Sequence, residues 1–359
     1  MAIGVPNIEI NFKALGVSAV TRSAKGIVAL IVKDTTNVTF NLKEYKFATD
    51  IEPALFTAAN VAYIRQVFLG TPNKVYVVRV GTSGTTGVAD AVLALGSRKY
   101  NWIGFAEAST TETTDLVTYV KAQEALKKTI KAVVFNATIS DSMHIVNFCN
   151  TSVTYKTGAT VTGEKYIARL LGVLAGLSLL QSSTYLVLDD LAGVVQPADL
   201  TVAVNAGKLV LFNDDVSVRI CRGVNSLITY TSGVTESMSK ILVVESMDLI
   251  RDDIYTTFKN TYTGKFKNIY DNQVLLISSI NSYFSTLADE GVLDNEFTNV
   301  SFVDIEAQRS AHLAIGKTMA ADWDDVTVRK NTFRSNVYLA GNIKIADAME
   351  DFVFNITME

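Results

Sequence analysis

The chain has 359 residues, of which 48% are hydrophobic and 19% charged, and its 32 Lys and Arg against 36 Asp and Glu give a formal net charge of -4. This composition excludes an intrinsically disordered protein, because disordered chains lack the apolar residues that offset chain entropy. The small negative charge, without a dense basic run, argues against nucleic acid as a partner. Single cores stop growing at about 250–300 residues, so we expect several domains.

Signals for export, membrane insertion and disulfide formation are weak. Ala2–Pro6 lacks the basic start and apolar core of a secretory signal, which predicts a protein made in the cytoplasm. The most apolar stretch, residues 170–180, is far shorter than the roughly 20 residues that a bilayer requires, and we interpret it as a buried helix. Cys149 and Cys221 are too few for a disulfide framework or a thiolate metal site, and we expect two buried thiols.

The first third predicts a terminal strand followed by a small β-rich unit. Ile8, Ile10 and Phe12 alternate with polar residues, which is the period of a strand. Residues 1–25 are therefore interpreted as a short terminal strand and a flexible linker. Residues 26–88 are expected to form an outer β-rich domain. Its predicted elements are a doubly buried strand at 26–32, a strand at 38–40, a helix near 54–68, a strand at 75–80 and a glycine-rich linker at 81–87.

The middle of the chain alternates strands and helices, which favours a mainly parallel sheet covered by helices. We expect this α/β domain to span residues 89–235. Its predicted elements are strands at 102–105, 132–135, 185–188 and 209–212, and helices near 114–128 and 164–180.

The last third predicts an α+β domain at residues 236–345, followed by an arm strand at 346–359. It opens with an apolar run at 241–244, and helices are expected around 248–261 and 272–289, the second with Asp271 as N-cap and Gly291 as terminator. Two alternating patterns predict strands near the end of the chain: Val337, Leu339, Ile343 and Ile345 in one, and Phe352, Phe354, Ile356 and Met358 in the other.

Catalytic and metal-binding patterns are missing. Acid–base or nucleophilic catalysis usually needs His, Cys or paired carboxylates, yet His144 and His312 are the only histidines and no Gly-x-Ser-x-Gly, His-Glu-x-x-His or Cys-x-x-Cys spacing occurs. Residues 158–166 are similar to a phosphate loop, but Glu164 precedes the lysine, and a hairpin or helix entry is favoured. The acidic pairs at 189–190, 214–215, 252–253 and 324–325 are expected in turns, caps or solvated faces. We predict no catalytic residue, cofactor or metal.

Several segments, taken in their order along the chain, together resemble the tail sheath proteins of contractile phages. They are Lys240–Ile254, Gly264–Lys265, Asp271–Asn272, Gly291–Leu293, Asp304–Glu306 and Asn336–Glu359, with support from Gly4–Pro6, Ala168–Gly176 and Ser182–Tyr185. The likeness is greatest to the short sheaths of phage-like particles from Gram-positive bacteria, including R-type bacteriocins of the diffocin kind. Whether the particle is a phage, a defective prophage or a bacteriocin stays open.

The resemblance implies a structural protein and not an enzyme. Sheath subunits polymerise helically around a tail tube and contract from an extended metastable state, which drives the tube through a target cell envelope. Implied partners are other copies of the chain, the tail tube protein, and baseplate and tail terminator proteins, without nucleic acid or direct membrane insertion. The resemblance also implies a central domain that is subtilisin-like in fold without protease chemistry, and assembly from the bacterial cytoplasm into particles released by lysis.

The same resemblance implies roles for named residues. Both terminal strands are expected to leave their own subunit and pair with a neighbour. The residues expected to link subunits are Ile8, Ile10 and Phe12 of the N-terminal arm and Phe352, Phe354, Ile356 and Met358 of the C-terminal arm. The acceptor strand is expected at Val337, Leu339, Ile343 and Ile345, and the hinges at Gly16 and Asp347. The candidate contacts to the tube are Lys259, Lys265, Lys267, Arg329, Lys330 and Arg334.

Alternatives stay open at this point. Both terminal strands can instead complete the sheet of their own domain, and the basic residues can serve solubility. An α/β hydrolase or protease-like enzyme is disfavoured by the missing nucleophile and base. A surface-layer protein would call for an export signal.

Overall fold

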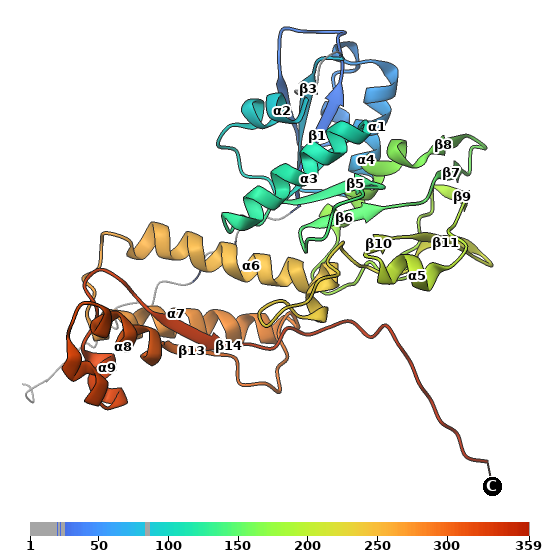
Figure 1. Cartoon of the computed structure of the whole chain (residues 1–359). Coiled ribbons are helices and arrows are strands. Elements are labelled where there is room, and N and C mark those ends of the chain that lie inside the picture. The colour runs from blue at the N-terminus through green and yellow to red at the C-terminus, as the bar shows by residue number, and fades with distance from the viewer. Residues whose placement is uncertain (1–19, 21, 23–25, 83–86, 359) are drawn as a thin grey trace, which may run out of the picture. The chain divides into compact units, whose positions relative to one another are not determined.

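The computed structural model describes residues 20, 22, 26–82 and 87–358. The predicted N-terminal strand with Ile8, Ile10 and Phe12, and the hinge at Gly16, lie outside these residues. The chain divides into two compact units (Figure 1): a larger unit of residues 23–252 and 347–359, and a smaller unit of residues 1–22 and 253–346. The fold is a mixed α/β one of more than one domain, as the strand and helix pattern predicts.

A seven-stranded sheet forms the centre of the larger unit, in the order β10-β6-β5-β4-β1-β3-β2. The neighbouring strands are parallel except β2 and β3, which are antiparallel. The strands are β1 (Ile27–Lys33), β2 (Leu42–Tyr45), β3 (Lys74–Val80), β4 (Trp102–Phe105), β5 (Lys131–Phe135), β6 (Ile145–Phe148) and β10 (Lys208–Leu209).

Helices cover both faces of this sheet, and β1 shows why. Val28, Leu30 and Val32 face one core, while Ile27, Ala29 and Ile31 face the other, so an unbroken apolar run suits a strand buried on both sides. The first core holds residues of α1 (Ala58–Phe68) and α4 (Ile167–Gly176), and the second holds residues of α2 (Gly87–Leu95) and α3 (Thr110–Ala125).

Residues 26–88 do not form a sheet of their own, which differs from the expected outer domain. β1 pairs with β3 on one side and with β4 on the other, so the boundary expected near residue 88 falls within one sheet. The physical reason is that a strand buried on both faces needs a helix layer on each side, and a unit of this size cannot supply both. The expected linker at 81–87 also ends in the first residue of a helix, α2, whose Val88, Ala91 and Leu95 are buried.

Small antiparallel sheets and short helices complete the larger unit. Residues 185–188 do not form the predicted strand, although they lie along β12 through the isolated bridge of Val187 to Arg219 and through backbone hydrogen bonds, such as that from Leu188 N to Val218 O at 2.9 Å. The expected strand at 209–212 is divided between β10 and β11, and the phosphate-loop-like segment forms the β7–β8 hairpin. The remaining elements are β7 (Ser152–Tyr155), β8 (Thr160–Thr162), β9 (Leu191–Val194), α5 (Leu200–Asn205), β11 (Leu211–Asp214), β12 (Ser217–Ile220) and the short helices η1 (Ala48–Asp50), η2 (Pro53–Leu55), η3 (Gly163–Tyr166) and η4 (Glu236–Ser239).

Helix α6 (Ile241–Thr257) begins earlier than predicted. The apolar run at 241–244 is its first turn, in which all four side chains are buried. The division between the two units falls within this helix, between Asp252 and Asp253.

The smaller unit is built on a long helix and a two-stranded sheet. Helix α7 (Tyr270–Asp289) starts after the N-cap Ile269, so Asp271 lies in its first turn and is not the cap; Gly291 follows its end with a φ of 78°, as a terminating glycine should. The other elements are the π-helical η5 (Phe258–Tyr262), β13 (Val300–Val303), α8 (Ile305–Ala314), η6 (Thr318–Asp322), α9 (Asp325–Lys330) and β14 (Leu339–Asn342). Among the described helices, none combines the length and apolar character needed to cross a membrane.

Candidate functional site: a clamped C-terminal segment and a basic groove

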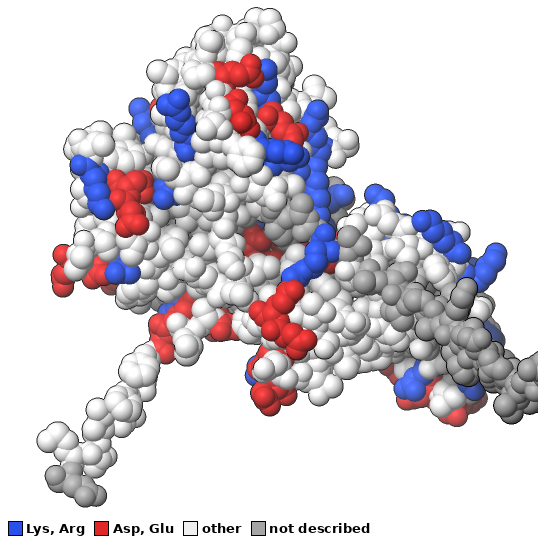
Figure 2. All heavy atoms as spheres, turned by 180° about the vertical axis from the view of Figure 1, so that it is seen from behind, with Lys and Arg blue, Asp and Glu red and all other residues white. Residues whose placement is uncertain are grey.

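The C-terminal segment, residues 352–358, carries large apolar side chains that the described part of the chain does not cover. Phe352, Phe354, Ile356 and Met358 are 86%, 69%, 70% and 89% exposed. The segment makes no backbone hydrogen bond to another described residue and belongs to no strand. In Figure 2 the segment extends away from a group of acidic side chains at its base, and its own side chains are uncharged. An apolar surface of this kind normally marks an interaction site.

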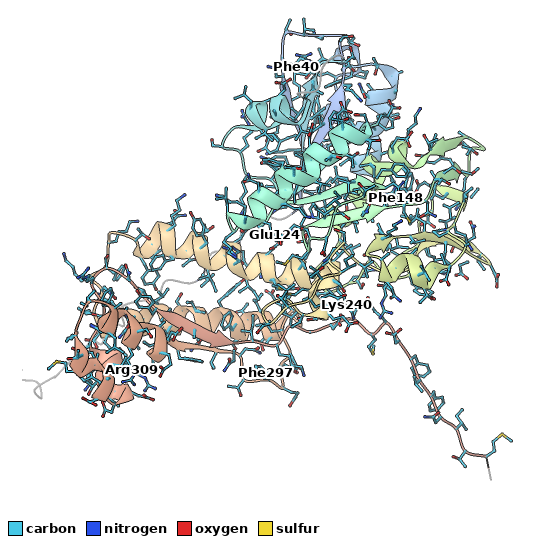
Figure 3. The ribbon with its side chains drawn as sticks, viewed as in Figure 1. Phe40, Glu124, Phe148, Lys240, Phe297 and Arg309 are labelled. Atoms are coloured by element: carbon cyan, nitrogen blue, oxygen red, sulfur yellow. The ribbon has the colours of Figure 1, made fainter. Side chains whose placement is uncertain are left out.

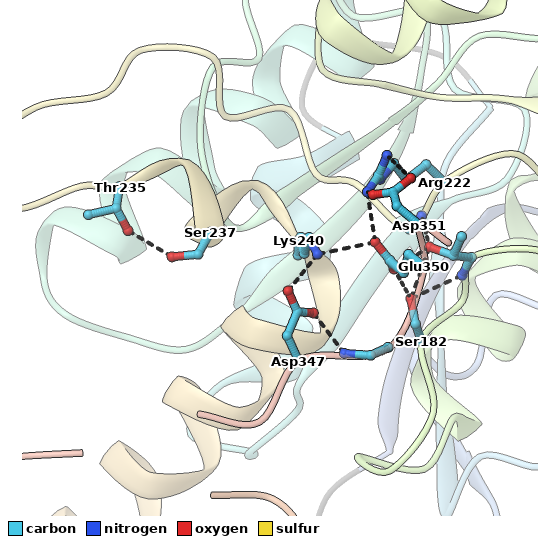
Figure 4. Close-up of polar contacts among 11 residues, drawn as sticks. Ser182, Arg222, Thr235, Ser237, Lys240, Asp347, Glu350 and Asp351 are labelled. Carbon is cyan, nitrogen blue, oxygen red and sulfur yellow. Dashed lines mark hydrogen bonds and ion pairs between the residues drawn. The ribbon is translucent and has the colours of Figure 1, made fainter. Parts of the chain in front are cut away.

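The root of this segment is held to the larger unit by a group of polar contacts that we call the clamp (Figure 4). The side chain of Glu350 is only 5% exposed. Its Oε1 accepts hydrogen bonds from Ser182 Oγ at 2.8 Å and Thr184 Oγ1 at 2.6 Å. Its Oε2 lies 3.2 Å from Lys240 Nζ and 3.3 Å from Arg222 Nη2. Four donors therefore surround one buried carboxylate.

Two exposed carboxylates flank Glu350 and use the same cations. Asp347 Oδ2 lies 2.5 Å from Lys240 Nζ, and Asp351 Oδ2 lies 2.6 Å from Arg222 Nη2. Asp347, which we expected to act as a hinge residue, is thus itself tied to the larger unit. Figure 3 shows Lys240 directly before helix α6, where the C-terminal segment leaves the molecule.

The charges of the clamp support one another. Burial would raise the pKa of Glu350, but hydrogen bonds from Thr184, Ser182 and Lys240 lower it below its usual value. Burial would lower the pKa of Lys240, yet Asp347 and Glu350 raise it. Because the pKa of the carboxyl is depressed, the clamp is fully formed at neutral pH and weakens as the pH falls through the folded value.

A glycine lets the two sides of the clamp approach. A Cβ atom at Gly223 would lie 2.4 Å from Ser183 Oγ and 3.2 Å from Ser182 Oγ. The backbone N–H of Gly223 donates to Thr184 Oγ1 at 2.9 Å, which orients that hydroxyl. The Ser-x-Thr segment noted in the sequence therefore has a structural role that its own residues do not reveal, because its partner lies 168 residues away from Ser182.

A groove of about 520 Å³ in the smaller unit brings together three of the six basic residues singled out from the sequence. Lys265, Lys267 and Arg334 line it beside Phe258, Tyr262 and Phe266. The rings of Phe258 and Tyr262 are stacked with centroids 6.4 Å apart, and the rings of Tyr262 and Phe266 are tilted relative to each other with centroids 5.1 Å apart.

Asn268 fixes the two loops that form the groove. Its amide donates to the carbonyl oxygens of Arg334 at 3.1 Å and Asn336 at 2.9 Å. The other three basic candidates are exposed but do not line the groove: Lys259 lies over the ring of Tyr255, and Arg329 and Lys330 end helix α9.

The observed strand β14, where the acceptor strand was expected, is shorter than the alternating stretch from Val337 to Ile345. β14 includes Leu339 only, paired with β13, while Val337 lines the groove and Ile345 makes a single bridge to Leu293. The ladder ends before Ile343 because Asn342 pairs with Val300, the first residue of β13. Among the described residues no strand pairs with the other edge of β14, so the backbone groups along that edge are a suitable template for a further strand.

The carboxyl edge of the parallel sheet, where α/β enzymes place their sites, is taken up by internal pairs. Lys33 Nζ contacts Glu112 Oε2 at 2.9 Å, and Glu107 Oε1 accepts from Tyr63 Oη at 2.6 Å. Burial would raise the pKa of Asp34, but hydrogen bonds from Asn60 and the backbone of Thr57 lower it to about 2. These polar groups stabilise the fold of the sheet edge.

The two histidines are also structural. His144 lies between two carboxylates, with Nε2 3.1 Å from Asp248 Oδ1 and Nδ1 3.3 Å from Glu124 Oε2. His312 is buried in α8 and its Nε2 lies 2.9 Å from the carbonyl oxygen of Asn331. Cys149 and Cys221 are half-buried free thiols, and burial raises the pKa of both.

Comparisons with known proteins agree with this structural role. Residues 234–359 match the phage tail sheath C-terminal domain. The tail sheath protein of Clostridium phage phiCD119 is 34% identical over 365 residues, covering 99% of both chains. The sheath tail protein of Desulfitobacterium hafniense has a TM-score of 0.70 at 15% identity, over 83% of this chain and 94% of the other.

A second solved structure extends the fold similarity over the full length. The contracted helical sheath of the anti-feeding prophage has a TM-score of 0.71 at 13% identity, over 100% of both chains. The family is structural, and the enzyme alternative has no support. The chain belongs to the phage tail sheath protein family.

Proposed function

We propose that copies of this chain polymerise as a helix around a tail tube, and that contraction of this sheath drives the tube through a cell envelope. The fold is shared with the contracted sheath of the anti-feeding prophage and with a contracted sheath complex of an extracellular contractile injection system. A baseplate structure of the anti-feeding prophage also has a similar fold, which supports baseplate proteins as partners. Terminator proteins are included because the sequence resemblance implies them.

The C-terminal segment is the proposed link between copies. The observation that carries this proposal is that Phe352, Phe354, Ile356 and Met358 are exposed while the root of the segment is fixed. Adding the segment to an open edge, such as that of β14, would form backbone hydrogen bonds worth roughly 0.5–1.5 kcal/mol each. Burial of the apolar face would add about 25 cal/mol per Å².

We further propose that rigid subunits rotate about these links during contraction, whereas the surface contacts between copies are exchanged. A ladder of buried backbone bonds survives such rotation better than exposed ion pairs, which contribute little and are screened by salt. The exposed lysines and arginines around the groove are the proposed contacts to the tube, where weak and releasable contacts are needed.

A finer description of the larger unit as subtilisin-like stays part of this proposal. It is supported by the parallel strands β6, β5, β4, β1 and β3, with helices on both faces. The N-terminal arm is proposed as a second link by analogy with the C-terminal one.

Replacement of alternate residues tests the C-terminal link. The triple substitution Phe354→Ser, Ile356→Ser and Met358→Ser removes the proposed buried face and should abolish sheath-like cylinders in negative-stain electron micrographs. The matched control replaces Val353, Asn355 and Thr357 by Ser on the opposite face and should assemble as the unaltered chain does. Equal assembly by both triple variants would contradict the proposal.

A further inference from the structure

We propose that Glu350 is the anchoring residue of the C-terminal segment, and that the clamp makes this segment a part of the larger unit although β14, which precedes it, belongs to the smaller unit. The inference deepens the proposed function, and its mechanical consequence rests on exchange of the segment between copies. The proposal starts from the division of the chain: the smaller unit ends at Ala346 and the larger unit resumes at Asp347.

The contacts on the two sides of this division differ in kind. Before it, the chain is held mainly by backbone pairing, through β14, the bridge of Ile345 to Leu293, and the hydrogen bond from Ala346 N to Val292 O at 3.0 Å; the one ion pair among the described residues there, from Lys344 to Asp294, is exposed on the lysine side. After it, the chain is held by side-chain charge, through Asp347, Glu350 and Asp351. Residues 349 and 352–358 are exposed on either side of Glu350. The buried carboxylate is therefore the point at which the segment is fixed.

The chemistry of Glu350 makes this fixation specific. Hydrogen bonds that involve a charged group are stronger than neutral ones, and the Glu350 carboxylate combines hydrogen bonds from two hydroxyls with ion pairs to two cations. Lys240 directly precedes α6, and Arg222 lies just beyond β12, which ends at Ile220. A force that a neighbouring copy exerts on the C-terminal segment would thus be transmitted through the clamp to the start of α6 and the end of β12. In this arrangement the segment follows the movement of the larger unit.

Glu350→Gln and Asp351→Asn are a matched pair of variants for the test. Each replaces one carboxylate by an amide in adjacent positions, but Glu350 is buried whereas the side chain of Asp351 is 76% exposed. In Glu350→Gln the new amide group would face Lys240 or Arg222 with a donor. We expect this change to shift the equilibrium toward a released segment by at least about tenfold. The exposed pair of Asp351 should contribute less than about fivefold.

Release is measured on the full-length chain before assembly. Spin labels are attached at Met349→Cys, a fully exposed position in the clamp, and at Val202→Cys, an exposed position of the larger unit, with Cys149 and Cys221 replaced by Ala. The distance distribution by pulsed electron paramagnetic resonance should be narrow for the unaltered clamp and for Asp351→Asn, and broad for Glu350→Gln. A narrow distribution for Glu350→Gln, or equal broadening by both variants, would overturn the proposal.

Thermal unfolding of each variant shows whether the larger unit stays folded. If Glu350→Gln does not fold, Ser182→Ala replaces it, because it removes one hydrogen bond to Glu350 and keeps all charges; intermediate broadening is then expected, and none would contradict the anchor. Assembly is scored separately. If a variant keeps the narrow distance distribution but forms no cylinders, the result concerns exchange of the segment between copies. If the distribution broadens in the unassembled chain, the result concerns the anchoring role of Glu350 alone.

Discussion

At the scale of single residues, buried charges are placed where secondary structure elements must be held in a fixed arrangement. Lys131 is 2% exposed and its Nζ lies 2.5 Å from Asp248 Oδ2 and 3.1 Å from Glu245 Oε1. Buried ion pairs add little net stability, but removal of one partner costs about 3–5 kcal/mol. The group that contains His144 and Lys131 therefore specifies how β5, β6 and the first part of α6 meet, and the clamp does the same for the C-terminal segment.

His144 predicts a pH dependence of stability. Burial would lower its pKa and Lys131 opposes its charge, but hydrogen bonds to Asp248 and Glu124 raise the pKa above the usual 6.5. The folded state therefore binds this proton more tightly than the unfolded state does. Its contribution is full below pH 6.5 and is lost as the pH rises through the folded value. Urea unfolding of the unassembled chain in a pH series that starts at about pH 6 and rises should show this loss.

The control for this pH series is His144→Gln, which keeps a polar side chain without the titrating charge. Its stability should be lower at acidic pH and should change less across the series. His312, for comparison, faces a carbonyl oxygen and two aromatic rings, not carboxylates. An unchanged pH slope in His144→Gln would contradict the assignment.

Sequence patterns predicted single residues unevenly. The apolar residues of 352–358 were noticed because alternation is a local signal, but the described segment forms no strand, and its pairing with a neighbouring copy stays a prediction. The sequence did not reveal the roles of Glu350, Arg222 and the two hydroxyls of the clamp, because contacts between segments distant in the sequence produce no periodic pattern. The Ser-x-Thr segment and Lys240 were noticed only through resemblance, and nothing in the sequence joined them to each other. Asp347 forms an ion pair with Lys240 that the sequence did not indicate, and its role as a hinge stays a prediction.

At the scale of elements, the aromatic and basic groove is a feature that local sequence patterns could not predict. Lys265 and Lys267 are neighbours in sequence, but Arg334 comes from a separate loop that Asn268 ties down. The helix boundaries also show where local signals fail: α6 begins in an apolar run whose residues suit a strand as well as a helix, and only tertiary packing decides between them. By contrast, Gly291 ended α7 as predicted, because a positive φ is a local requirement.

The groove predicts that its charge matters for assembly on tubes. Lys265→Glu with Lys267→Glu should reduce the amount of sheath that cosediments with purified tubes, and the reduction should be greatest at low ionic strength, where exposed charges are least screened. The matched control is Lys127→Glu with Lys128→Glu, which makes the same charge change at two exposed positions of the larger unit, outside the groove and outside the candidate tube contacts. If both pairs of substitutions act equally, net charge and not the groove is responsible.

At the scale of the whole molecule, the α/β class of the middle of the chain followed from the alternation of strands and helices, but the extent of its sheet did not. The order β4-β1-β3 inserts the first strand between two later ones, and no local pattern encodes that crossover. The chain also returns from the smaller unit to the larger one at Asp347. These long-range features place the C-terminal segment at the surface with its apolar residues uncovered, which is the arrangement that exchange between copies requires.

The central claim is that the C-terminal segment is shared between copies, and cryo-electron microscopy of assembled full-length chain tests it most directly. The trace of residues 343–358 should pass through the clamp on its own larger unit and then continue onto a neighbouring copy, with Phe352, Phe354, Ile356 and Met358 buried there. A trace in which these four side chains fold back onto their own subunit would contradict the account.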